Sequence, residues 1–88
     1  MPRTPAERKP AAGHRKSSQA LAANFLRIRL GLKETQAQFA KRLRIVQTQV
    51  SEVEQGGHNP KLHSLDDWAY YLDIDVCDLL RPPEQSGD

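Results

Sequence analysis

Apolar residues recur at spacings of three and four along most of the chain, and strand signals are absent throughout. This pattern predicts five helices, each with one apolar face, that begin near Ser17, Thr35, Gln47, Pro60 and Asp75. Serine, threonine and aspartate at three of these starts can accept hydrogen bonds from the first backbone N–H groups of a helix. We therefore expect an all-α fold, a compact bundle of five helices.

The third predicted helix, at roughly residues 47–55, is unusually polar. Val50 and Val53 alone make up its apolar side. The opposite face consists of Gln47, Thr48, Ser51, Glu52 and Gln55. A helix with so little apolar surface is either held in place by its neighbours or used by a partner.

Length and composition exclude several classes of protein. Eighty-eight residues are enough for one small domain, and the single cysteine excludes an internal disulfide or a zinc site built from cysteines. We expect Cys77 to be buried in the last helix. The three histidines are scattered and lack the spacing of metal ligands. No apolar run reaches the roughly 20 residues that span a bilayer, and no apolar segment follows the basic N-terminus as in a secretory signal. These features predict a soluble, cytoplasmic protein.

Charge divides the chain into two unlike halves. Residues 1–44 contain 11 Lys and Arg against two Glu, a net charge of +9, whereas residues 45–88 contain two basic and nine acidic residues, a net charge of −7. Such asymmetry indicates a nucleic acid or an anionic membrane as partner, or a basic tail that only maintains solubility. The two ends lack large apolar residues, so we expect a disordered basic arm at 1–16, a folded domain at 17–80 and a disordered tail at 81–88.

The second and third predicted helices are separated by only about four residues and have the proportions of a helix-turn-helix. In that unit the second helix crosses the DNA backbone and the third lies in the major groove, with its polar face toward the base edges. A glutamine-rich third helix suits this task, because glutamine can pair through two hydrogen bonds with adenine N6 and N7.

The order and spacing of several segments resemble the lambda-repressor-like domain of the Cro/cI (XRE) family of bacterial and phage regulators. The resemblance covers residues 25–80 and rests on LRIRLGL at 26–32, TQAQFA at 35–40, VSEVEQG at 50–56 and Asn59-Pro60. It implies a compact five-helix DNA-binding domain. Arg44 stands where the family commonly has a glycine in the turn. Val46 replaces the usual serine or threonine cap of the third helix, so Thr48 is expected to cap a helix that starts later.

The resemblance assigns roles to three sets of residues. Those expected to contact DNA bases lie on the third helix: Gln47, Thr48, Gln49, Ser51 and Glu52. Those expected to contact phosphates lie on or after the second helix and in the loop after the third: Gln36, Lys41, Arg42, Arg44, His58, Asn59 and Lys61. Gln36 is also expected to brace the third helix. Arg27 and Glu54 are expected to form a salt bridge between the first and third helices.

The function that the resemblance implies is that of a sequence-specific transcriptional regulator, bacterial or phage-encoded and associated with the nucleoid through double-stranded DNA. We expect a repressor that binds an inverted repeat as a homodimer. Tyr70 or Tyr71, with Leu79 or Leu80, is a candidate dimer contact. No cofactor, metal, membrane or small-molecule substrate is expected.

The alternative is a protein-interaction module on the same scaffold, such as an antitoxin or an antiactivator with a protein partner. Glu52 motivates it, since a carboxylate in a groove repels phosphates unless it accepts a hydrogen bond from cytosine N4. The acidic second half of the chain points the same way. An enzyme is not expected, because the sequence offers no carboxylate pair, no nucleophile with a base and no glycine-rich phosphate loop.

Overall fold

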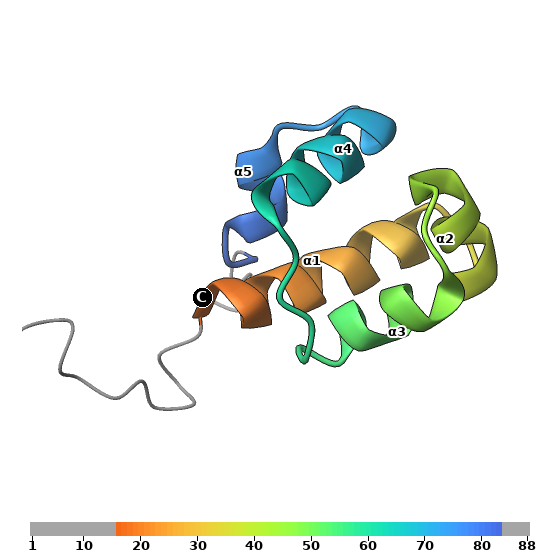
Figure 1. The fold of residues 1–88 in the computed structure, drawn as a ribbon, viewed down its shortest axis with the longest axis horizontal. Coiled ribbons are helices and arrows are strands. Elements are labelled where there is room, and N and C mark those ends of the chain that lie inside the picture. The colour runs from red at the N-terminus through yellow and green to blue at the C-terminus, as the bar shows by residue number, and fades with distance from the viewer. Residues whose placement is uncertain (1–15, 84–88) are drawn as a thin grey trace, which may run out of the picture.

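The computed structural model describes residues 16–83, which form five helices and no strand (Figure 1). The helices are α1 (Lys16–Gly31), α2 (Gln36–Leu43), α3 (Gln47–Glu54), α4 (Leu62–Leu72) and α5 (Val76–Leu80). The expected all-α fold of five helices is therefore confirmed. The predicted arm and tail fall mostly outside the described residues, although Lys16 already belongs to α1. Within 16–83 no helix is both long enough and apolar enough to cross a membrane.

Two helices begin at the capping residues that the sequence indicates. The Thr35 hydroxyl accepts from the Gln38 backbone N–H at 3.1 Å, and the Gln38 side chain accepts from the Thr35 N–H at 2.9 Å. This reciprocal pair satisfies two backbone donors at the start of α2. The Asp75 carboxylate accepts from the Cys77 N–H at 2.9 Å and caps α5 in the same way. The short helices α2 and α5 thus have their starts fixed locally.

The start of α3 is fixed without a side-chain cap. Val46 occupies the cap position, its side chain makes no capping hydrogen bond, and its carbonyl accepts from the N–H groups of Gln49 and Val50. The expectation that Thr48 caps a later start is wrong, because α3 already begins at Gln47. Thr48 is exposed in the first turn instead.

The turn between α2 and α3 requires a left-handed backbone at Arg44, with φ 60° and ψ 40°. This conformation costs a residue with a Cβ roughly 1–2 kcal/mol, which explains why glycine is favoured in such a turn. Here the arginine gains a contact that glycine could not make. Its guanidinium lies 4.9 Å from the centre of the Tyr71 ring, a cation–π contact that ties the turn to α4.

Helix α1 is the central element of the bundle. It packs against both α3 and α5, while α2 packs against α3 and α4. In the view of Figure 1, α3 lies below α1, and α4 and α5 lie above it. The polar helix α3 and the C-terminal helix α5 therefore use different sides of α1.

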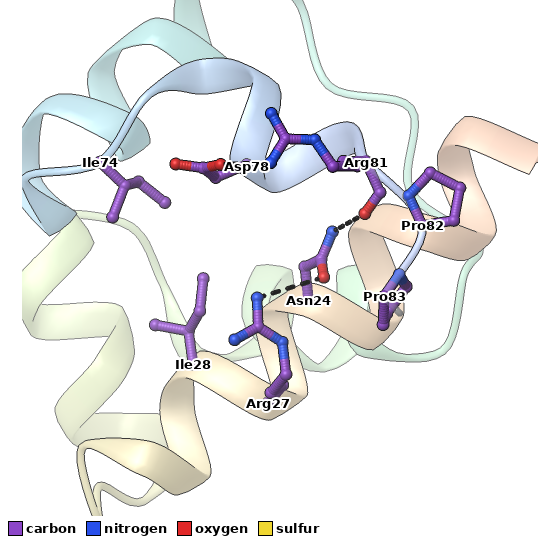
Figure 2. Close-up of a pocket in the computed structure, with 8 residues that line it drawn as sticks. All are labelled: Asn24, Arg27, Ile28, Ile74, Asp78, Arg81, Pro82 and Pro83. Atoms are coloured by element: carbon purple, nitrogen blue, oxygen red, sulfur yellow. Dashed lines mark hydrogen bonds and ion pairs between the residues drawn. The ribbon is translucent and has the colours of Figure 1, made fainter. Parts of the chain in front are cut away.

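A buried asparagine joins α1 to the end of α5 (Figure 2). Asn24 is only 1% exposed, and its side-chain amide donates to the carbonyls of Leu79 at 2.9 Å and Arg81 at 2.8 Å. Its carbonyl oxygen accepts from Arg27 at 3.4 Å. The contacts of the folded domain thus extend to Arg81, one residue past the boundary that the sequence indicates.

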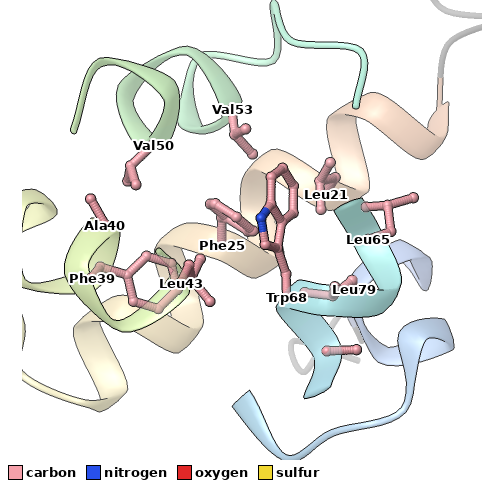
Figure 3. Close-up of a cluster of buried hydrophobic side chains, with 11 residues drawn as sticks. Leu21, Phe25, Phe39, Ala40, Leu43, Val50, Val53, Leu65, Trp68 and Leu79 are labelled. Atoms are coloured by element: carbon pink, nitrogen blue, oxygen red, sulfur yellow. The ribbon is translucent and has the colours of Figure 1, made fainter. Parts of the chain in front are cut away.

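The core gathers apolar side chains from all five helices around Phe25 (Figure 3). The Phe25 ring lies 5.2 Å from that of Phe39, edge to face, and 5.1 Å from that of Trp68. In α5, Leu79 is fully buried and cannot contribute to a dimer contact. Cys77 is exposed, contrary to expectation, because two residues of helix turn it about 200° away from Leu79.

Replacing Asn24 should loosen the attachment of α5. We expect Asn24→Ala to lower the free energy of unfolding by about 2 kcal/mol, because the buried Leu79 carbonyl loses its donor. Urea denaturation followed by circular dichroism measures the change. The control is Gln19→Ala, an exposed position on the same helix, which should stay within about 0.5 kcal/mol of the wild type. Equal effects of the two substitutions would contradict the role of Asn24 in holding α5 against α1.

Candidate nucleic-acid interface

Helix α3 divides into a narrow buried side and a broad polar side. Val50 and Val53 are 0% and 1% exposed and pack into the core. Gln47, Thr48, Glu52 and Gln55 are exposed, while Gln49 and Ser51 are half-buried. The polar face expected from the sequence is therefore present on the surface. Two valines are a small apolar contact for a helix, so α3 depends on further interactions with its neighbours.

An ion pair with a hydrogen-bonded amide holds the C-terminal end of α3. Arg29 of α1 donates to Glu54 through Nε at 2.6 Å and through Nη2 at 3.2 Å. Gln36 of α2 donates to the same carboxylate at 3.0 Å. The Arg29 and Glu54 side chains are 14% and 8% exposed. Three helices therefore meet at one carboxylate that is largely removed from solvent.

The prediction of a salt bridge between Arg27 and Glu54 is wrong, because the arginine that pairs with Glu54 is Arg29. Two residues along a helix differ in direction by about 200°, so the two arginines point to different sides of α1. Arg29 faces α3, whereas Arg27 reaches Asn24 on the side of α5. Both arginines flank Ile28 in the sequence. The sequence contains no signal that tells which side of α1 receives α3.

The surroundings of Glu54 decide its protonation. Burial raises the pKa of this carboxyl, but the hydrogen bonds from Arg29 and Gln36, together with the charge of Arg29, outweigh burial. The net effect is a pKa below the ordinary glutamate value. Glu54 is therefore ionised at neutral pH and can accept all three hydrogen bonds.

Two of the basic residues expected to contact phosphate already have partners. Arg42 forms a two-pronged ion pair with Glu34, with Nη2–Oε2 at 2.6 Å and Nε–Oε1 at 3.0 Å. The hydrogen bond from Arg42 lowers the pKa of the Glu34 carboxyl. Arg44 lies over the Tyr71 ring, as described above. Both arginines are nevertheless exposed residues.

Lys41 lies next to Arg42 in the last turn of α2 and is exposed. It lines a shallow depression together with Lys33 and Glu34. Lys33 was not among the residues expected to contact phosphate. It follows α1 with a left-handed backbone, φ 58°, and its side chain is exposed. The basic cluster near the end of α2 therefore includes Lys33 in addition to Lys41 and Arg42.

The loop after α3 places its residues in two directions. Asn59 and Lys61 are exposed. His58 turns back toward α3 instead. Its Nε2 lies 3.3 Å from the Gln49 side-chain nitrogen, and its Nδ1 lies 3.7 Å from a Glu52 oxygen. In this arrangement both ring nitrogens face residues of α3 that are expected to contact bases, and neither faces outward to a phosphate.

Residues 16–83 bring together no cluster of candidate metal ligands. No three His, Cys, Asp or Glu side chains in that range could hold a metal ion. The hydrogen bond and the charge of Asp75 raise the pKa of the exposed Cys77 thiol, so the sulfur stays protonated and weakly nucleophilic at neutral pH. What the described surface offers is hydrogen-bond donors and acceptors on α3 and positive charge beside it.

Comparison with known proteins finds similarity in structure rather than in sequence. No protein-family model matches the chain, and no curated protein sequence does. A crystal structure of a hypothetical transcription factor, NHTF, from Neisseria superposes with a TM-score of 0.69 at 26% sequence identity. The match covers 86% of this chain and 85% of that one. The two proteins therefore share a fold over most of their lengths, while the resemblance to the Cro/cI family stays a prediction.

The two arginines of α1 should differ sharply in their effect on stability. We expect Arg29→Ala to lower the free energy of unfolding by about 2 kcal/mol at pH 7, because the Glu54 carboxylate loses its charged partner in a poorly solvated site. Arg27→Ala is the matched control and should cost clearly less, below about 1 kcal/mol, because it removes only the long hydrogen bond of 3.4 Å to Asn24. Urea denaturation of both variants measures the difference. A larger loss for Arg27→Ala would restore the pairing that the sequence suggested.

The stabilisation that Glu54 contributes should disappear in acid. Its pKa is lower in the folded than in the unfolded chain, so the contribution is complete above about pH 5 and falls as the pH drops through the folded-state pKa. We expect the stability gap between wild type and Glu54→Gln to narrow between about pH 5 and pH 3. Thermal denaturation across this range measures the gap. A gap that stays constant would mean that the carboxylate charge contributes nothing.

Proposed function

We propose that the protein is a sequence-specific DNA-binding transcriptional regulator that inserts α3 into the major groove. The observation that carries this proposal is the attachment of α3 from one side only. Val50, Val53 and Glu54 hold the helix against the bundle, and the opposite face is left exposed and polar. A helix held in this way can enter a groove without losing the contacts that position it.

The residues at the start of α3 have the chemistry to distinguish base pairs. The Gln47 amide can donate to adenine N7 and accept from adenine N6, and the Thr48 hydroxyl can donate or accept. Both side chains are exposed and neither is charged. Ser51 and Glu52 follow one turn later on the same face. We infer that these positions supply base specificity.

Positive charge beside α3 would supply the affinity for the DNA backbone. Lys41 and Lys61 are exposed, and Gln36 lies at the first residue of α2, where backbone N–H groups favour an anion. Arg42 and Arg44 would each contact a phosphate while keeping their contacts with Glu34 and Tyr71. Similarity to the Neisseria protein, a hypothetical transcription factor, supports the same role. Such a regulator would act in the cytoplasm, at the nucleoid.

The form of regulation that we propose is repression by a homodimer that occupies an inverted repeat. Two copies related by twofold symmetry would place their α3 helices about one turn of DNA apart, roughly 34–36 Å. Tyr70 is the candidate dimer contact, since the residue is 81% exposed on α4 and the neighbouring Tyr71 ring packs edge-on against it. Occupation of a promoter needs no cofactor and no catalysis.

A second candidate function is that of a protein-interaction module that uses α3 as its contact. The observation that favours it is the Glu52 carboxylate, 55% exposed in the middle of the polar face. An acid at this position would suit a basic protein partner. It suits DNA only where it meets a cytosine amino group.

Selection from a random duplex pool with purified protein, at near-physiological salt, tests the proposal. We expect an enriched inverted repeat with half-sites one helical turn apart. Enrichment of a single half-site would contradict the proposed homodimer but support the recognition of bases. Absence of any retained DNA would overturn the proposal and favour the protein-interaction module.

Substitutions should separate base contacts from phosphate contacts on the selected duplex. Gln47→Ala should cost about 1–3 kcal/mol on that duplex and relax the preference at one base pair, whereas Lys41→Ala should weaken binding to all duplexes and lower the salt slope by about one. Arg81→Ala, which removes one positive charge at the end of α5, is the control and should change neither. Fluorescence anisotropy at several salt concentrations measures both. Intact specificity in Gln47→Ala would move the base contacts to another residue.

A further inference from the structure

His58 belongs to the loop after α3, and its side chain is turned toward that helix. Three contacts hold its ring in place. The Gln49 and Glu52 side chains approach its two nitrogens at 3.3 Å and 3.7 Å. The ring also packs against Trp68 of the core, with 6.4 Å between the ring centres. The side chain is 23% exposed. His58 is therefore part of the structure behind α3, and it touches two residues expected to contact bases.

The contacts with Gln49 and Glu52 together indicate where the proton of His58 lies. The Gln49 atom at 3.3 Å is the amide nitrogen, which can only donate. The Glu52 carboxylate beside Nδ1 favours a proton on that nitrogen of a neutral ring, which leaves Nε2 to accept from the Gln49 amide. With its nitrogen turned inward, Gln49 directs its carbonyl oxygen away from His58. That oxygen has no hydrogen-bond partner within residues 16–83 and is not buried, so a hydrogen-bond acceptor reaches solvent beside α3.

Protonation of His58 would reverse this arrangement. A doubly protonated ring has an N–H at Nε2, which repels the amide N–H of Gln49 and favours its carbonyl oxygen instead. The amide then turns by half a rotation, and its nitrogen with both hydrogens faces outward. The proton on Nδ1 stays beside Glu52 in both states. Only the group that Gln49 presents changes, from an acceptor to a donor.

We propose that His58 is a positioning residue that sets the base preference at Gln49, so that this preference changes with pH. An outward acceptor favours the amino group of cytosine or adenine in the major groove, and an outward donor favours guanine or thymine oxygens. The inference rests on the proposed function, because a base must face Gln49 for the change to be read. It replaces the expectation that His58 contacts a phosphate.

Among the three side chains that contact the His58 ring, that of Glu52 is charged. Glu52 is the charged group that α3 places against the ring, and Trp68, which packs on the ring from α4, carries no charge. Gln49 is neutral at all relevant pH values. His63 lies on α4 with its side chain exposed and contacts neither Gln49 nor Glu52 by a hydrogen bond or ion pair. His63 therefore serves as the control histidine.

The test compares binding to a panel of duplexes that differ at single base pairs of the selected half-site, at about pH 5.5 and about pH 8, a range in which histidine side chains change charge. For the wild type we expect the relative affinity for two bases at one position to change by roughly five- to hundredfold between the two pH values. His58→Gln and Gln49→Ala should abolish the change. His63→Gln should retain it.

The outcomes separate the inference from the proposed function. A wild type that binds one site with the same base preference at both pH values overturns the role of His58 and leaves the DNA-binding function intact. Persistence of the change in His58→Gln also overturns it. Failure to bind any duplex specifically at either pH overturns the proposed function and, with it, this role of His58.

A measurement on the wild-type protein without DNA covers the case in which His58→Gln does not fold. Nitrogen-15 NMR of the imidazole rings at about pH 8 should show His58 with its proton on Nδ1, whereas free histidine mostly carries it on Nε2. The Gln49 side-chain amide signals should shift together with those of the His58 ring as the pH falls. A proton on Nε2 at high pH, or Gln49 signals that do not follow the ring, would contradict the inference.

Discussion

The position of α3 depends on one carboxylate, that of Glu54. Its partners come from two other helices, Arg29 from α1 and Gln36 from α2. The two buried valines of α3 give contact area but little direction, whereas three hydrogen bonds to one small group fix the helix end in position and orientation. Because the Arg29 and Glu54 side chains are mostly removed from solvent, the pair is screened little by salt. A polar helix of eight residues gains its order from this contact.

This arrangement separates the parts of the domain that give stability from those that remain available to a partner. Core packing around Phe25, the attachment of α5 by Asn24 and the Glu54 contacts all lie behind α3. The polar groups at the start of α3 are exposed and take no part in that packing. Substitutions on such a surface can therefore change the target that it binds with little effect on the fold. His58 is the exception, since it contacts both the core and the polar face.

Sequence periodicity was sufficient to predict the five helices, and capping chemistry the starts of α2 and α5, because both are local properties. The polar face of α3 followed from the same local pattern. Three features could not be found in this way, because each depends on how the helices pack. The choice between Arg27 and Arg29 requires knowing which side of α1 meets α3, and the exposure of Cys77 requires knowing how α5 is rotated. The inward turn of His58 depends on the path of a loop that has no periodic pattern.

An NMR map of the DNA contact tests most directly whether α3 is the surface that meets DNA. The selected duplex is added to nitrogen-15-labelled protein, and the changes in backbone and side-chain amide signals are assigned to residues. We expect the largest changes at residues 47–52 and at Gln36, smaller ones at Lys41 and Lys61, and little change in α5. Changes concentrated in α5 with α3 unaffected would show that the polar face of α3 does not bind DNA.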